Sequence, residues 1–221
     1  MKVLALDTAT TDLVTGVVDT ETGESTDRVL ADTRAHNEQL IPTVEALLDD
    51  VSLTYADLSA IVVGTGPGPF TGLRVGMATA SALGVALSLP VHGVCTLDAI
   101  AHGREGEWLV AIDARRKEVY WATYSNARRV SGPEVSKPEE LAGAAARLVF
   151  PESIAPRLPE ELAGLPREWA TPRAKGLVAC ADLDAEPAPL VPLYLRRPDA
   201  KVPKSAPRSA ALVGGEGQPA S

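Results

Sequence analysis

The sequence predicts an α/β protein built from two similar halves. Each half opens with three strand-like segments, and a helical segment follows them. The first set of strands covers residues 2–8, 13–20 and 25–35, and the second set begins at residue 107. The 221 residues are 45 % hydrophobic, mainly Ala, Val and Leu, so the chain can bury an aliphatic core.

The first half alternates helices and strands after its opening strands. Residues 36–51 carry apolar side chains at helical spacing, and Pro42 fits a first turn or a kink better than an undisturbed helix interior. Residues 59–66 form a short apolar strand that leads into a glycine-rich loop. Residues 73–88 have the length of a helix, and residues 90–103 give a short strand and a helical turn.

The second half repeats the opening pattern in a shorter form. Residues 107–115 and 118–125 are strand-like and are joined by a charged turn, which indicates a hairpin. A short third strand is expected near residues 128–130. Residues 137–150 predict a helix with Pro138 near its start.

The C-terminal part contains an irregular stretch and two further ordered segments. Residues 151–172 are rich in proline, residues 172–183 predict a last helix, and residues 191–198 a final ordered segment. The composition beyond them is dominated by Pro, Ser, Gly and Ala, which is typical of disorder. We therefore expect a first domain, a second domain and a disordered tail, with the bounds 1–103, 104–198 and 199–221.

The charge of the chain restricts the class of partner. The sequence has 21 basic and 29 acidic side chains, which give a net charge of −8. A protein that grips nucleic acid by itself normally carries a basic surface, so the balance argues against that class. It does not exclude a subunit whose partner supplies the basic surface.

The cysteines and the apolar segments indicate a reduced, cytoplasmic protein. Cys95 and Cys180 are far apart and form no disulfide framework. The N-terminal apolar run has four residues before Asp7, which fits a first strand rather than a signal peptide. No apolar stretch reaches about 18 residues without a polar interruption, so we expect no membrane span.

The glycine-rich loop "GTGPGPFTGLRVG" at residues 64–76 suggests a phosphate cradle, but its composition disfavours one. No lysine occurs between Lys2 and Lys117, so a P-loop is absent. The dinucleotide-binding spacing of glycines is broken by Pro69 and Thr71. The two prolines of the loop also lack the N–H groups with which a backbone binds phosphate.

A stiff turn that begins a helix is the favoured interpretation of this loop. Thr71 is a suitable N-cap, since its hydroxyl can accept a hydrogen bond from an early helical N–H. Arg74 is unusual, because a cation in a first turn opposes the helix dipole. It either leans into solvent or pairs with a carboxylate, on this chain or on a partner.

The predicted helix after the loop has two faces of small residues. One face could pack on the sheet while the other accepts another helix, although ordinary core packing also explains an alanine-rich helix. Glycine costs about 1 kcal/mol in a helix interior relative to alanine, so two of them indicate close backbone approach. The two faces are Gly76, Ala80 and Gly84, and Ala78, Ala82 and Ala86.

The chain lacks a recognisable catalytic motif. Its three histidines do not have metal-ligand spacing, and neither cysteine carries the signature of a nucleophile. Asp7 and Asp113 follow equivalent strands in the two halves. Each could hold magnesium through water and act as a base in phosphotransfer, or simply cap a turn.

Six segments carry a family resemblance, and they occur in order along residues 1–198. They read "LALDTAT", "HNEQLIPTVEALL", "GTGPGPFTGLRVGMATASALG", "VCTLDAIA", "DARRKEVYWA" and "PLYLR". The chain resembles the bacterial TsaB (YeaZ) family of tRNA threonylcarbamoyladenosine biosynthesis proteins. The resemblance implies an actin-like, Hsp70-like, sugar-kinase-like fold made of two RNase H-like halves.

The resemblance also implies a function without catalysis. Members of the family support formation of N6-threonylcarbamoyladenosine at position 37 of tRNAs that read codons beginning with A. They pair with the transferase TsaD, of which they are non-catalytic paralogues, and the ATPase TsaE joins the pair. Contact with tRNA would be indirect, through the complex, and the protein would not be a protease, despite older peptidase labels.

The resemblance places a partner surface on the first two helices. In the helix at 36–51 it implies Glu38, Leu40, Ile41, Val44 and Leu48. In the helix at 73–88 it implies Arg74, Met77, Ala78, Ser81, Ala82 and Val85.

Nucleotide binding and two other functions remain as alternatives. No cofactor of its own is expected, and ATP or ADP would bind only at a subunit junction. The candidate nucleotide contacts are Asp7, Thr8, Gly66, Thr71 and Asp113. The alternatives to an accessory subunit are an ATP-dependent phosphotransferase of the sugar-kinase type, which would use Asp7 or Asp113, and a module that forms only a homodimer.

Overall fold

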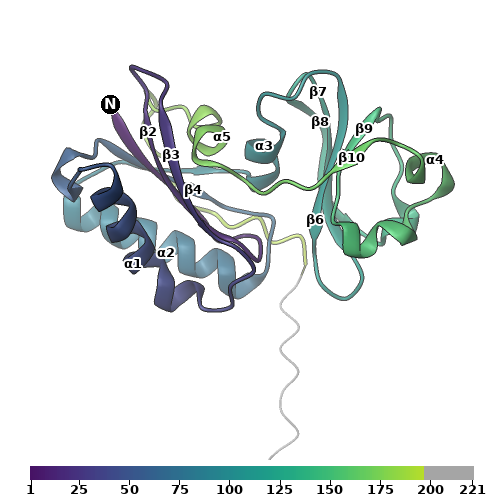
Figure 1. The fold of residues 1–221 in the computed structure, drawn as a ribbon, viewed down its shortest axis with the longest axis horizontal. Coiled ribbons are helices and arrows are strands. Elements are labelled where there is room, and N and C mark those ends of the chain that lie inside the picture. The colour runs from purple at the N-terminus through teal and green to yellow at the C-terminus, as the bar shows by residue number, and fades with distance from the viewer. Residues whose placement is uncertain (197–221) are drawn as a thin grey trace, which may run out of the picture.

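Short apolar strands build one five-stranded sheet in each half of the chain (Figure 1). The computed structural model describes residues 1–196. In the first sheet β1 pairs with β2 in the antiparallel direction and with β4 in the parallel direction, and the strand order is β3-β2-β1-β4-β5. The strands of this sheet are β1 (Lys2–Asp7), β2 (Leu13–Asp19), β3 (Ser25–Leu30), β4 (Ala60–Gly64) and β5 (Val91–Val94).

The second sheet repeats the connectivity of the first. Read from its other edge, its order is β8-β7-β6-β9-β10, so its third, second, first, fourth and fifth strands follow one another as those of the first sheet do. This confirms the predicted duplication and the actin-like, sugar-kinase-like fold of two RNase H-like halves. The strands are β6 (Glu107–Asp113), β7 (Val119–Ser125), β8 (Arg128–Ser136), β9 (Arg147–Val149) and β10 (Arg167–Glu168).

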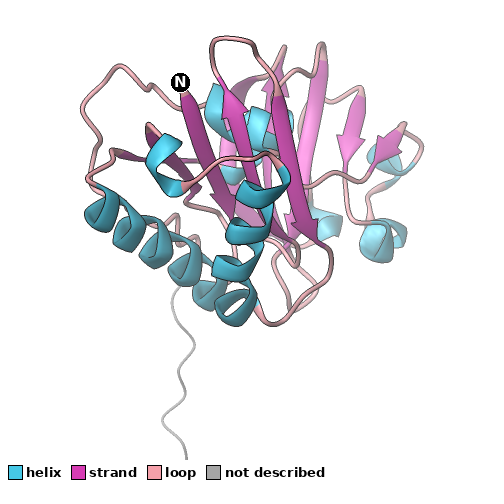
Figure 2. Ribbon diagram, turned by 60° about the vertical axis from the view of Figure 1, so that its left-hand side comes forward, coloured by secondary structure: helices cyan, strands magenta, loops and turns pink. Residues whose placement is uncertain are grey.

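Helices cover both faces of the first sheet. Leu4 and Leu6 of β1 pack in one core cluster with residues of α1 (His36–Asp50) and α2 (Phe70–Leu87). The two helices lie together on the outer face of the sheet (Figures 1 and 2). The alternate residues of the same strand pack against helices on the other face, as the two-residue period of a strand requires. Those helices are α3 (Thr96–Ala101) and α5 (Ala174–Ala179), which lie between the two sheets.

The second half contains only short helical segments. It holds α4 (Glu160–Ala163) and the 3-10 turns η2 (Pro138–Glu140) and η3 (Glu152–Arg157), whereas η1 (Tyr55–Asp57) belongs to the first half. Trp108, Val110 and Ile112 pack toward α3, and the alternate residues of β6 pack toward the segments beyond β9. The two long helices of the described residues therefore both belong to the first half.

The helix predicted at residues 137–150 is wrong. The segment forms the turn η2 and then the strand β9, which pairs in parallel with β6. Gly143 has a φ of +139°, which is outside the helical region, so a helix cannot continue through it. Leu148 and Val149 are fully buried in the sheet, and this burial outweighs the helix propensity of the alanines before them.

The predicted division into domains is crossed by the C-terminal part of the chain. Helix α5 contacts β1 and β2 of the first half, although its residues lie within the range predicted for the second domain. The bounds at residue 103 and residue 198 therefore stay a prediction. The tail expected at 199–221 lies outside the described residues.

Residues 190–196 form an irregular segment, here named the strap, that contacts both halves. Leu190 packs on the core of the first half and Leu195 on the core of the second. The backbone N–H of Leu193 donates to the carbonyl oxygen of Thr65 over 2.9 Å. Arg196 donates to the carbonyl oxygen of Ala114 over 3.2 Å and forms an ion pair with Glu118.

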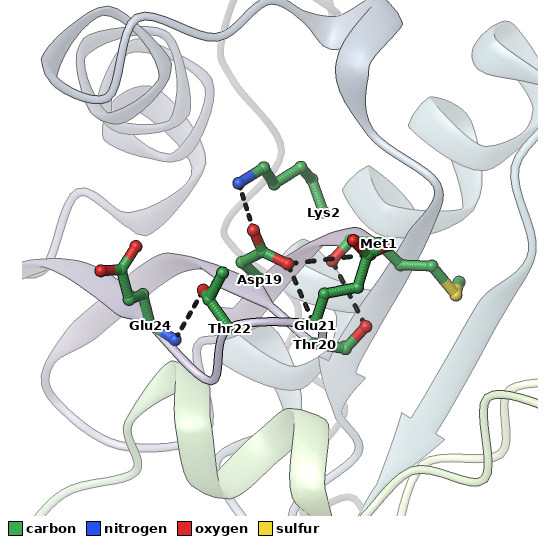
Figure 3. A network of polar contacts seen from close by, with 7 residues as sticks. All are labelled: Met1, Lys2, Asp19, Thr20, Glu21, Thr22 and Glu24. Carbon is green, nitrogen blue, oxygen red and sulfur yellow. Dashed lines mark hydrogen bonds and ion pairs between the residues drawn. The ribbon is translucent and has the colours of Figure 1, made fainter.

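A polar network around the turn between β2 and β3 fixes the N-terminus of the chain (Figure 3). Lys2 Nζ lies 2.6 Å from Asp19 Oδ2, and the backbone N–H of Glu21 donates to Asp19 Oδ1 over 3.0 Å. The terminal ammonium of Met1 lies 2.9 Å from the Glu21 carboxylate. The hydrogen bond from Lys2 lowers the pKa of Asp19 to about 2, so this carboxylate is charged across the physiological range.

Candidate functional site

Helix α2 approaches β1 closely through two glycines. The Thr8 hydroxyl donates to the carbonyl oxygen of Gly72 over 2.7 Å and accepts from the N–H of Gly76 over 3.1 Å. These are the two backbone groups that an uninterrupted helix would pair with each other. A Cβ at Gly72 would overlap the Thr8 carbonyl oxygen, and one at Gly76 would overlap the Thr8 hydroxyl. The glycines therefore allow the first turns of α2 to lie directly on the end of β1.

The two small-residue faces of α2 have different surroundings. Gly76, Ala80 and Gly84 are buried against the sheet, as the sequence predicts for one face. The other predicted face is exposed to solvent. Its exposed residues, with those beside them on the helix, are Arg74, Ala78, Ser81, Ala82, Val85 and Ala86. Val85 is 84 % exposed, which is high for a β-branched apolar side chain.

Helix α2 is more apolar than its burial in this chain explains. Its 18 residues have a mean hydropathy of 1.3, and 28 % of them are buried. By length and composition α2 is the one helix of the described residues that could cross a membrane, a test that core helices also pass. Arg74 is its only charged residue. The uncovered apolar surface is therefore a candidate protein interface.

The residues that the resemblance assigns to the partner surface divide by burial. Arg74, Ala78, Ser81, Ala82 and Val85 are exposed on α2, and Glu38 is exposed on α1. Ile41 is half-buried.

Four of the assigned residues require a correction. Leu40, Val44 and Leu48 are at most 3 % exposed, because they pack into the core of the first half. Met77 is 8 % exposed and joins the same core. Their helical spacing is that of the core-facing side of each helix, so their side chains support the surface from behind and do not form it.

Arg74 lies in an aromatic setting that the sequence does not reveal. Its guanidinium carbon is 4.0 Å from the centroid of the Phe70 ring, and its Nε donates to the Tyr194 hydroxyl over 3.2 Å. The rings of Phe70 and Tyr194 stack with their centroids 5.1 Å apart. No carboxylate of residues 1–196 forms an ion pair with Arg74, so a pair on a partner stays a prediction.

The predicted N-cap of α2 is wrong. The helix begins at Phe70, and Pro69 is its N-cap residue. Thr71 is exposed in the first turn and makes no capping hydrogen bond. Pro69 has the extended backbone of an N-cap residue, and its side chain has no oxygen that could accept from the first N–H groups of the helix.

Asp7 faces the interior of the first half. Its carboxylate accepts hydrogen bonds from the Thr96 hydroxyl over 2.7 Å and from the N–H of Ala9 over 2.8 Å. Burial raises the pKa of this carboxyl to about 6, although the two hydrogen bonds oppose the shift. The group joins β1 to the start of α3 and does not line the cleft between the halves.

The other candidate nucleotide contacts do not converge with Asp7. The carbonyl oxygen of Gly66 accepts from the N–H of Thr96 over 2.7 Å. Thr8 and Thr71 line a cavity of about 240 Å³ beside α1 and α2. Asp113 lines the adjoining cavity, which shares Thr10, Thr11, Pro69 and Arg115 with the first, and it accepts from the N–H of Arg115 over 2.8 Å.

The cleft between the two halves has a volume of about 420 Å³. The charged residues that line it are three acidic ones, Asp32, Asp113 and Glu152, and one basic one, Arg115. A phosphate group requires positive charge or several free N–H donors, and this lining supplies little of either. Among residues 1–196, no group of three or more His, Cys, Asp or Glu side chains is arranged to hold a metal ion.

The fold and the exposed face of α2 together define a class of protein. It is a protein of the actin-like, sugar-kinase-like fold, with two five-stranded sheets and a largely exposed apolar helix on the first half. The family model described as TsaD, tRNA N6-adenosine threonylcarbamoyltransferase, matches residues 30–167.

Comparison with known proteins narrows the class to one family. An uncharacterized protein of Mycobacterium tuberculosis is 51 % identical over 206 residues, which are 90 % of this chain and 93 % of the relative. The tRNA threonylcarbamoyladenosine biosynthesis protein TsaB of Escherichia coli is 36 % identical over 132 residues, which are 56 % of this chain and 55 % of the relative. YeaZ from Pseudomonas aeruginosa superposes with a TM-score of 0.68 at 28 % identity, over 81 % of this chain and 89 % of that structure. The chain belongs to the TsaB (YeaZ) family, which is related to TsaD.

Proposed function

We propose that this protein is a non-catalytic subunit of the cytoplasmic complex that forms N6-threonylcarbamoyladenosine at position 37 of tRNA. It acts by forming a heterodimer with TsaD. Two findings support the tRNA modification: the match to the TsaD family model, and the biosynthetic role for which the related TsaB of Escherichia coli is named. The exposed apolar face of α2 is the observation that carries the heterodimer.

The small side chains of this face suit contact with another helix. Ala78 and Ala82 are four residues apart and exposed, so a partner helix can come close to the α2 backbone. Interhelical distances of about 8–10 Å depend on the side chains at the contact, and small ones allow the shorter distance. Exposed Val85 extends the apolar surface toward the C-terminus of the helix.

The interior position of Asp7 supports the non-catalytic part of the proposal. A general base must reach the proton that it removes, and the Asp7 carboxylate is fully buried and bonded to Thr96 and Ala9. We further propose that the subunit has no nucleotide of its own and that ATP or ADP binds only at a subunit junction. TsaE joins the pair, and tRNA contacts the complex through the other subunits.

Reconstitution of the modification tests the proposed function. Purified TsaD, TsaE and TsaC are incubated with tRNA, threonine, bicarbonate and ATP, and threonylcarbamoyladenosine is measured by mass spectrometry. We expect modification only when this protein is added. Equal modification without it would contradict the proposal.

The exposed apolar face of α2 could also pair with the same face of a second copy of this protein, which would give a homodimer. Light scattering of the protein alone and with TsaD separates the two cases. A homodimer that dissociates when TsaD is added agrees with the proposal. A homodimer that persists and binds no TsaD contradicts it.

A further inference from the structure

The cluster of Phe70, Arg74 and Tyr194 at the start of α2 joins two distant parts of the sequence. Phe70 and Arg74 are one helical turn apart, and Tyr194 comes from the strap. The guanidinium lies over the Phe70 ring at 4.0 Å, and Nε donates to the Tyr194 hydroxyl over 3.2 Å. One face and one donor of the guanidinium are therefore used within the chain.

The strap holds Tyr194 in this position. The N–H of Leu193 is bonded to Thr65 in the loop before α2, and Leu190 and Leu195 on either side are packed on the two cores. Stacking of Tyr194 on Phe70, with ring centroids 5.1 Å apart, adds a second constraint. The orientation of Arg74 is thus fixed before any partner arrives.

The remaining donors of Arg74 are available to a partner. Arginine presents a planar fork that binds a carboxylate with two parallel hydrogen bonds. The Arg74 side chain is exposed, and no acidic residue of the described chain forms an ion pair with it. A pre-oriented side chain loses little conformational freedom when it binds, which strengthens its contribution to an interface.

The position of Arg74 places this fork within the exposed face of α2. Arg74, Ala78 and Ala82 are spaced by four residues, so they lie in one row along the helix. Arg74 is also the only charge on this apolar helix. A single charged group within an apolar interface contributes more to the alignment of the partner than to the affinity.

We propose that Arg74, held by Phe70 and Tyr194, binds a carboxylate of the partner helix that packs on α2. The inference rests on the proposed pairing with TsaD and names the chemistry of that partner surface. It also gives the strap a role in the interface, so that the segment "PLYLR" acts through Tyr194.

Calorimetric titration of purified TsaD with variants of this protein tests the inference. We expect Arg74→Gln to weaken binding by about 30-fold or more, since truncating one partner of a hydrogen-bonded charge pair that is buried in the interface costs at least that much. Arg74→Lys should weaken binding nearly as much. A lysine ammonium is not planar, so it cannot stack on the Phe70 ring or form two parallel hydrogen bonds with one carboxylate. Tyr194→Phe removes one hydrogen bond and should weaken binding by roughly 3- to 10-fold.

A matched control and a salt series separate the ion pair from general effects. Arg128→Gln makes the same change of charge on an exposed arginine of the second half, and its affinity should equal that of the unmodified protein. The affinity of the unmodified protein should fall more steeply with salt than that of Arg74→Gln, because an ion pair is screened and packing is not. Equal salt dependence of the two would contradict a carboxylate partner.

Two results would overturn the inference in distinguishable ways. If Arg74→Gln binds TsaD within twofold of the unmodified protein while Ala82→Trp does not bind, the helix face is correct and the role of Arg74 is wrong. If the unmodified protein binds no TsaD at all, the proposed function fails and this inference fails with it.

Discussion

At the scale of the residue, a buried carboxyl group sits at the centre of the first half. Asp7 is fully buried, and its pKa is about 6 because burial disfavours the charged form. The folded pKa is higher than the unfolded value of about 3.9, so folding favours the protonated form. The buried charge of Asp7 therefore lowers the free energy of unfolding by its full amount above pH 6. This destabilisation disappears as the pH falls from about 6 toward 4.

We predict that Asp7→Asn stabilises the protein at neutral pH. Asparagine keeps an acceptor for the N–H of Ala9 and an amide group beside the Thr96 hydroxyl, but it carries no charge. A shift of about two pKa units corresponds to about 3 kcal/mol, so the gain in unfolding free energy at pH 8 should approach 2–3 kcal/mol. Urea unfolding between pH 4.5 and 8 measures it. The gain should shrink toward acid pH, and a constant difference between the two proteins would contradict the prediction.

At the scale of the element, hydrophobic periodicity predicts most strands and both long helices but not the surfaces that they use. The apolar spacing in α1 correctly marks a helix, yet Leu40, Val44 and Leu48 form its core side and not a partner surface. The alanine-rich run before β9 has the composition of a helix, and only Gly143 and the pairing with β6 exclude one. The periodicity identifies which side of a helix is buried. Only the structure shows whether the core of the same chain or another surface buries it.

Some contacts of the site cannot be predicted from local sequence. Tyr194 is 120 residues from Arg74, and no spacing rule joins a C-terminal segment to the start of α2. The segment "PLYLR" is visible in the sequence as a family motif without a role. The close packing of α2, in contrast, can be predicted, because two helical glycines indicate backbone contact.

The contact between α2 and β1 leads to a second prediction. Alanine normally stabilises a helix relative to glycine by about 1 kcal/mol. Gly76→Ala should instead destabilise the protein by roughly 1–3 kcal/mol, because its Cβ would overlap the Thr8 hydroxyl. The expected fall in Tm is about 2–10 °C for a chain of this length.

A second glycine provides the control for that measurement. Gly164 has an ordinary φ of −84°, and a Cβ at this position would meet only open space, so Gly164→Ala should leave Tm nearly unchanged. If Gly76→Ala were as stable as the unmodified protein, the close approach of α2 to β1 would not limit the residue at that position.

At the scale of the whole molecule, the duplication is unequal, and the inequality favours the first half as the site of the proposed partner surface. Both halves have the same strand order, but the long helices α1 and α2 occur only in the first half. The second half covers the face of its sheet that points away from α3 with 3-10 turns and a four-residue helix. A net charge of −8 disfavours direct binding of nucleic acid, which agrees with the proposal that tRNA contacts the other subunits. The molecule is therefore best suited to act through the outer face of its first half.

The most direct test of this account is complex formation between Ala82→Trp and TsaD. Ala82 is exposed, so the tryptophan should leave Tm within about 2 °C of the unmodified value, as surface substitutions usually do. Ala144→Trp, at an exposed loop position of the second half, is the matched control. In sedimentation velocity with TsaD, we expect the unmodified protein and Ala144→Trp to form the heterodimer and Ala82→Trp to remain separate. A heterodimer of Ala82→Trp with unchanged affinity would contradict the claim that the exposed face of α2 binds TsaD.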